Sequence, residues 1–127
     1  MSNAMSIAAS GIQAASLRLQ AAASNIVNAN SDGPADGSGA YQPVSVSQSS
    51  TQDGGVSASL QPVTPSTLLA YDPNSPYANV QGMVAQPNMD MATQIVDMKQ
   101  AEHDFRASLM AYKASSQMFK TLLDATA

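Results

Sequence analysis

The one histidine of the chain, His103, stands between two acids in the sequence AEHDF, where a metal site or an acid–base group would first be sought. Consecutive residues of a helix point about 100° apart, so Glu102, His103 and Asp104 cannot converge on one ion. Metal ligands on a helix are spaced three or four residues apart, and His103 has no acid or second histidine at those distances. We therefore expect a solvated surface histidine and no metal.

Other catalytic patterns are also missing. One histidine and no nucleophile-elbow sequence leave the many serines without a catalytic triad. The sequence DGSG at 36–39 lacks the lysine and the helix start of a phosphate-binding loop. The eight methionines suit packing better than cofactor binding, and five basic residues in a chain of net charge −4 argue against nucleic acid. The sequence predicts no enzyme, no cofactor and no small-molecule substrate.

The composition predicts a modest hydrophobic core. The 127 residues include no Trp or Cys, two Phe and four Tyr. Much of the hydrophobic content is alanine, which buries little area, so a chain of this kind is marginal when it folds alone. The first four residues, Met1 to Ala4, resemble the remnant of an expression tag, and we take the native chain to begin at Met5.

Residues 5–30 carry a heptad pattern typical of a coiled-coil helix. Large apolar residues recur every seven positions, with an alanine three residues after each of them. A surface helix of an ordinary globular protein is the alternative, but its outer face should be charged, and here Arg18 is the only charge. The large positions are Met5, Ile12, Leu19 and Ile26.

Residues 31–89 have a different pattern. A turn-rich stretch is followed by two alternating segments, 41–50 and 56–63, on either side of Asp53-Gly54-Gly55, which predicts a β-hairpin. From residue 67 onward the sequence is typical of extended chain interrupted by prolines. All five acids between 31 and 90 lack a basic neighbour in sequence, so we expect this segment to be exposed.

Residues 90–127 predict a second coiled-coil helix. Asp90 is a suitable N-cap, because its carboxylate can accept from the free N–H groups of the first turn. From there apolar residues keep a spacing of four and three, interrupted at Glu102 and Ser116. The apolar line contains Met91, Ile95, Met98, Phe105, Leu109, Tyr112, Phe119 and Leu123.

These segments predict a mainly α fold with a small β insert. Two long heptad-patterned terminal helices, antiparallel and coiled-coil-like, flank a hairpin and extended middle segment. We expect the β segment to project from the junction of the helices. We also expect neither helix to find a second apolar layer within the chain.

Two stretches resemble a known family. The sequence ASNIVNAN (23–30) is similar to the signature that closes the N-terminal helix of bacterial flagellar axial proteins, the rod, hook and hook-junction subunits. The stretch 71–98 resembles the proximal rod proteins of that family, through Tyr71, Asp72, Pro73, Pro76, Gly82, Val84, Pro87, Asn88 and Asp90. The ending FKTLLDATA is similar through Lys120, Thr121 and Leu122, whereas residues 31–66 hardly match.

The resemblance implies a structural subunit of the basal-body rod, which spans the periplasm. Such subunits are exported by the flagellar type III apparatus without a cleaved signal peptide, and they assemble through their terminal helices with other axial proteins and with copies of themselves. The alternative is a helical adaptor or secretion chaperone that binds a partner helix, which would not need the β insert. The expected assembly interface comprises Ile12, Leu19, Ile26, Asn25, Asn28, Ile95, Met98, Phe105, Leu109, Tyr112, Phe119 and Leu123.

The pair Asn25 and Asn28 poses a separate question at the end of the first helix. Asparagine can hydrogen-bond freed carbonyls of the last turn or the backbone of a neighbouring segment. The pattern leaves open whether these bonds form within the chain or with a neighbouring subunit.

Replacing Ile12, Leu19 and Ile26 together by Asp should abolish incorporation into basal bodies and motility, because charge on the helix face opposes apolar packing. Expression should be unchanged. Swimming assays and immunoblots of isolated basal bodies measure both effects, and a motile triple variant would contradict the assignment of this face.

Overall fold

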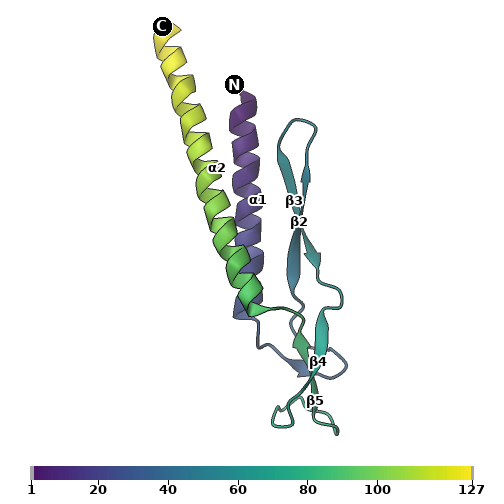
Figure 1. Cartoon of the computed structure of the whole chain (residues 1–127). Coiled ribbons are helices and arrows are strands. Elements are labelled where there is room, and N and C mark those ends of the chain that lie inside the picture. Colours follow the sequence, from purple (N-terminus) through teal and green to yellow (C-terminus); the bar gives the residue numbers. More distant parts are fainter. Residues whose placement is uncertain (1, 127) are drawn as a thin grey trace.

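The computed structural model describes residues 2–126; Met1 of the presumed tag remnant and Ala127 of the predicted C-terminal helix lie outside the described residues. Two antiparallel helices form its long axis, α1 (Ser2–Val27) and α2 (Met91–Thr126) (Figure 1). The predicted pair of long terminal helices around a small β region is confirmed. The N-terminal helix starts before Met5 and ends at Val27, three residues short of the predicted Asn30.

Small side chains form the contact between α1 and α2. On α1 the alanines of the predicted heptad, Ala8, Ala15 and Ala22, are buried, as is Ala101 on α2. A Cβ atom placed on Gly11 would lie 2.7 Å from the hydroxyl oxygen of Ser108, so the two helices approach closely there. The large heptad residues of α1 are half-buried at the flanks of this contact.

The apolar line of α2 lies beside the α1 contact rather than at its centre. The one residue of α2 that is fully buried is Ala101, which directly precedes the interruption at Glu102. Glu102 is half-buried and bonds Arg106 at 2.6 Å and Lys99 at 3.3 Å on its own helix. Close packing favours the column of small residues, and the larger apolar side chains are displaced to the flank.

The predicted hairpin is present, but its position differs from the prediction. Strands β2 (Val44–Ser50) and β3 (Val56–Pro62) pair antiparallel, with Val44 opposite Pro62 and Ser50 opposite Val56. Instead of projecting from the helix junction, the hairpin folds back along α1 (Figure 1). Its valines face α1 and a row of serines faces outward, so α1 does have a second layer within the chain, contrary to the expectation.

A second small sheet lies at the junction end of the helices. It consists of β1 (Gly33–Pro34), β5 (Met83–Pro87) and β4 (Thr67–Tyr71) in the order β1-β5-β4, all antiparallel. Val84 and Ala85 of the central strand are buried. The predicted extended chain from residue 67 onward is present at residues 67–71 and 83–87, and the structure adds that these two segments pair with each other across the loop between them.

The far end of α2 has no partner within the described chain. With 36 residues against the 26 of α1, α2 is longer by about 15 Å at 1.5 Å per residue. Its residues 116–126 are all exposed, and Figure 1 shows this end extending past the start of α1. Among the helices of residues 2–126, none combines the length and apolar character that crossing a membrane would require.

Replacing Ala101 by Leu should lower the free energy of unfolding by about 1–3 kcal/mol, because the larger side chain cannot fit between α1 and α2 without moving them. The exposed Ala114 of the same helix supplies the control, since Leu has room there. Urea unfolding followed by circular dichroism measures both; equal stability of the two variants would contradict a close contact at Ala101.

Candidate functional site

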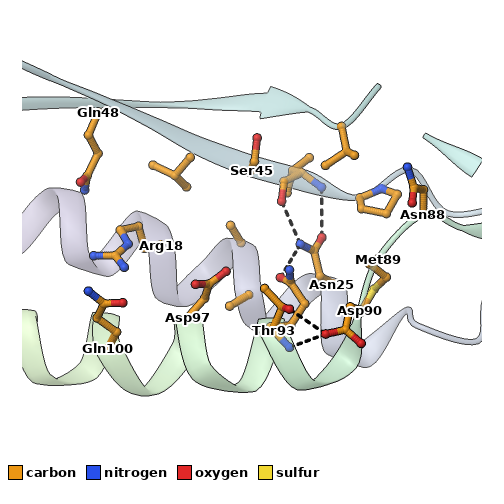
Figure 2. Close-up of a pocket in the computed structure, with 17 residues that line it drawn as sticks. Arg18, Asn25, Ser45, Gln48, Asn88, Met89, Asp90, Thr93, Asp97 and Gln100 are labelled. Atoms are coloured by element: carbon orange, nitrogen blue, oxygen red, sulfur yellow. Dashed lines mark hydrogen bonds between the residues drawn. The ribbon is translucent and has the colours of Figure 1, made fainter. Parts of the chain in front are cut away.

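The side chain of Asn25 connects three elements at the junction end of the molecule. It lies on α1, is 1% exposed and uses both polar atoms of its carboxamide. Its Nδ2 donates to the carbonyl of Val44 on β2 and to Oε1 of Gln94 on α2, both at 2.8 Å. Its Oδ1 accepts from the backbone N–H of Val44 at 3.0 Å (Figure 2). The same oxygen accepts from the hydroxyl of Tyr41, also at 3.0 Å.

The contact with Val44 reproduces the hydrogen bonding of a neighbouring strand. Residues 43 and 51 form backbone hydrogen bonds with residues 63 and 55 across the hairpin. In an antiparallel pair such residues alternate with residues whose N–H and C=O groups point away from the partner strand. In β2 the residues that point away from β3 are therefore 44, 46, 48 and 50. Val44 is one of these, and the carboxamide of Asn25 supplies one donor and one acceptor to it. The side chain thus pairs the free backbone groups at the start of β2 and fastens the hairpin to α1.

A second contact fastens the far end of the hairpin. The hydroxyl of Ser10 near the start of α1 accepts from the backbone N–H of Val56 on β3 at 3.1 Å. Asn25 and Ser10 lie about four turns apart on α1 at 3.6 residues per turn, so the hairpin is held to the helix at both ends. This explains why it lies along α1 rather than projecting.

Tyr41 and Ser24 extend the Asn25 cluster. Since the Tyr41 hydroxyl donates to Asn25, its oxygen is free to accept from the hydroxyl of Ser24 at 2.9 Å. Among the described residues, no buried side-chain nitrogen or oxygen lacks a hydrogen-bond partner. A completely paired cluster of this kind favours one arrangement of its elements, because each alternative leaves a buried polar atom unpaired.

The side chain of Asn28, directly after α1, hydrogen-bonds to that helix. Its Nδ2 donates to the carbonyl of Ser24 at 2.9 Å, which also accepts from the backbone N–H of Asn28 at 3.1 Å, so the side chain adds a second hydrogen bond to the last turn of α1. Of the two predicted uses of asparagine, Asn25 shows the bond to the backbone of a neighbouring segment, whereas Asn28 bonds a carbonyl that already has a backbone partner. These bonds of Asn25 and Asn28 form within the chain. Tyr41 and Gln94 were missed as partners, because neither stands in a pattern that marks a buried polar residue.

The start of α2 places Gln94 against Asn25. Asp90 is the N-cap, as predicted: its Oδ2 accepts from the Thr93 hydroxyl at 2.6 Å and from the Thr93 backbone N–H at 2.9 Å. These two hydrogen bonds lower the pKa of the Asp90 carboxyl. Further along the helix pair, away from the junction end, Arg18 of α1 forms a salt bridge with Asp104 of α2 at 2.7 Å, which is a second polar contact between the helices.

The expected assembly residues divide into three groups. Asn25 is buried in the chain's own junction and offers no surface to a neighbour. Ile95, Phe119 and Leu123 are 44%, 47% and 54% exposed on α2. The remaining residues, all half-buried, are Ile12, Leu19, Ile26, Asn28, Met98, Phe105, Leu109 and Tyr112.

A groove lies between the hairpin and α2, with α1 as its floor (Figure 2). It has a volume of about 790 Å³ and is bounded at one end by the Asn25 cluster. Its lining is polar, with Gln48 on one wall and Asp97 and Gln100 on the other. In the described part of the chain no three acids or histidines are grouped to hold a metal, and His103 is exposed, as predicted.

Replacing Asn25 by Ala should lower the free energy of unfolding by about 3 kcal/mol, since Val44, Tyr41 and Gln94 would all lose partners. The Asn28→Ala variant loses the bond to the Ser24 carbonyl and a long bond from the Ser31 hydroxyl, both at a half-exposed position, and should cost about 1 kcal/mol. Hydrogen exchange gives a local measure: the Val44 amide should exchange faster in Asn25→Ala and unchanged in Asn28→Ala. Unaltered Val44 exchange in both would refute the strand-like role of Asn25.

Comparison with known proteins gives a consistent family. No protein-family model matches the chain. The flagellar basal-body rod protein FlgC of Agrobacterium fabrum is 30% identical over 98% of this chain and 94% of its own length. The FlgC proteins of Aquifex aeolicus and Salmonella typhimurium are 30% and 34% identical, covering 97% and 94% of this chain and 95% and 94% of their own lengths.

At this coverage the aligned region spans both helices and the β region between them. The chain belongs to the family of the flagellar basal-body rod protein FlgC, and it is a structural subunit of the rod rather than an enzyme.

Proposed function

We propose that the chain takes its place in the rod by packing the apolar flanks of its helices against other axial proteins and against copies of itself. The observation that carries this proposal is the exposed apolar side chains of α2. Ile95 and Val96 are exposed near its start, and a further group lies on the part that extends past α1: Met118, Phe119, Leu122 and Leu123. Contiguous exposed apolar side chains are typical of interaction surfaces.

The surface on the end of α2 continues the contact already made with α1. The small residues Ala101, Ser108 and Ser115 are spaced seven apart along that contact, and the next position in the series is Leu122. A neighbouring helix can therefore pack on the same face of α2 beyond the point where α1 begins. In this arrangement the helices α1 and α2 make the contacts between subunits, and the β-containing segment between them lies further out.

Export as an unfolded chain through the flagellar secretion apparatus is part of the same proposal. The residues buried in the helix pair are mostly alanines. Because alanine buries little apolar area, the free energy that opposes unfolding is small. Such a chain can be unfolded for export and gains its remaining stability from neighbours in the rod.

The double variant Phe119→Ser, Leu123→Ser tests the assembly surface. These side chains touch no other part of the described fold closely enough to be buried, so the isolated variant should melt at the same temperature as the original. Its amount in isolated basal bodies should fall at least about tenfold, with a matching loss of swimming.

The double variant Lys113→Gln, Lys120→Gln is the matched control, because it changes two exposed residues of the same helix without removing apolar area. It should assemble normally. Normal incorporation of the Phe119, Leu123 variant would show that this end of α2 is not an assembly surface.

A further inference from the structure

The edge of β2 that faces the groove is open beyond the Asn25 cluster. Like Val44, residues Val46 and Gln48 point their backbone N–H and C=O groups away from β3. In the part of the chain that the structure describes, these four groups have no hydrogen-bond partner, whereas those of Val44 are paired with Asn25.

Such an edge is normally protected. Proteins place lysine, proline or a covering segment on the exposed edge of a sheet to prevent another strand from pairing with it. Residues 44–50, VSVSQSS, contain neither lysine nor proline, and the groove keeps α2 apart from the edge (Figure 2). The length of open edge suits a short extended segment, which would lie over the crevice between α1 and α2.

The groove also has an unbalanced negative charge. Arg18 is the one cation in its lining, and it is engaged by Asp104. Asp90 and Asp97 both line the groove, and within residues 2–126 neither forms an ion pair. Asp97 is half-buried on the wall opposite Gln48, so a basic side chain on an entering segment would find a carboxylate there.

We propose that this groove binds an extended segment of a different axial protein, which adds to β2 as a third strand and places a Lys or Arg beside Asp97. The inference rests on the proposed assembly into the rod and names one contact within it. A second copy of this chain does not supply the segment, because all five of its basic residues, Arg18, Lys99, Arg106, Lys113 and Lys120, lie in helices and its strands carry none.

Gln48→Pro tests strand addition directly. Its side chain is exposed and its N–H points away from β3, so proline removes only the edge donor and leaves the β2–β3 ladder intact. Gln48→Ala removes the same side chain and keeps the N–H. We expect Gln48→Pro to reduce incorporation into basal bodies at least about tenfold relative to Gln48→Ala. Both should keep the original circular dichroism and slow Val44 exchange.

Asp97 tests the charge. Asp97→Lys should reduce incorporation about as strongly, because it opposes the basic side chain, and Asp97→Asn should have a weaker effect. Equal incorporation of Gln48→Pro and Gln48→Ala would overturn the inference while leaving assembly itself intact. Failure of the original chain and of Gln48→Ala to enter basal bodies would instead refute the proposed function.

A photo-cross-linking amino acid at Gln100, on the α2 wall of the groove, identifies the occupant. In basal bodies we expect a cross-link to a non-helical, Lys- or Arg-containing segment of another axial protein. A cross-link to a second copy of this chain or to a helix of any subunit would refute the inference. So would the absence of any cross-link in basal bodies that contain the variant.

Discussion

The arrangement of the whole chain depends on one buried carboxamide. Asn25 binds the backbone of Val44 at the edge of β2, the phenol of Tyr41 and Gln94 at the start of α2 at the same time. Asn25 itself is buried, and these three partners are half-buried. Because an unpaired polar atom at that position is costly, the helix pair and the hairpin share one geometry at this end. The apolar contacts alone would allow the hairpin to slide along α1, since valine on alanine specifies position weakly.

The contact between the helices follows from a different constraint. Alanine, glycine and serine let α1 and α2 approach closely, but they leave the larger residues of both helices on the flanks. A close contact of small residues orients the helices and buries little apolar area. The fold is therefore well specified in geometry and modest in stability, a combination that suits a subunit whose final environment includes other subunits.

Sequence patterns predicted the elements well and their mutual placement poorly. Apolar residues repeat every seven positions in α1 and α2 and every second position in β2 and β3. These repeats are local properties of the sequence, so the helices, the hairpin and the N-cap Asp90 could be found from residue types alone. The position of the hairpin along α1 could not be predicted, because it depends on Asn25 meeting Val44 and Ser10 meeting Val56 across long stretches of sequence.

The same limit applies to the candidate site. The pairing of β4 with β5 joins segments that are distant in sequence, so local patterns do not indicate it. The apolar line of α2 lies beside the contact with α1 because only small residues fit at the centre of so close a contact. The expected interface grouped Asn25 with the apolar residues, since a sequence cannot distinguish a polar group that binds its own chain from one that binds a neighbour. Gln94 and Tyr41 gave no signal, because each acquires its role only from the side chain it meets.

The antiparallel pairing of the helices also has a practical consequence for labelling. Both described ends of the chain lie at the same end of the molecule, where α2 extends past α1 (Figure 1). A fluorescent protein or affinity tag fused to either terminus would therefore lie near the same exposed apolar helix end and could shield it. The loop between β4 and β5, at the opposite end of the helix pair, is the site where a small epitope would interfere least.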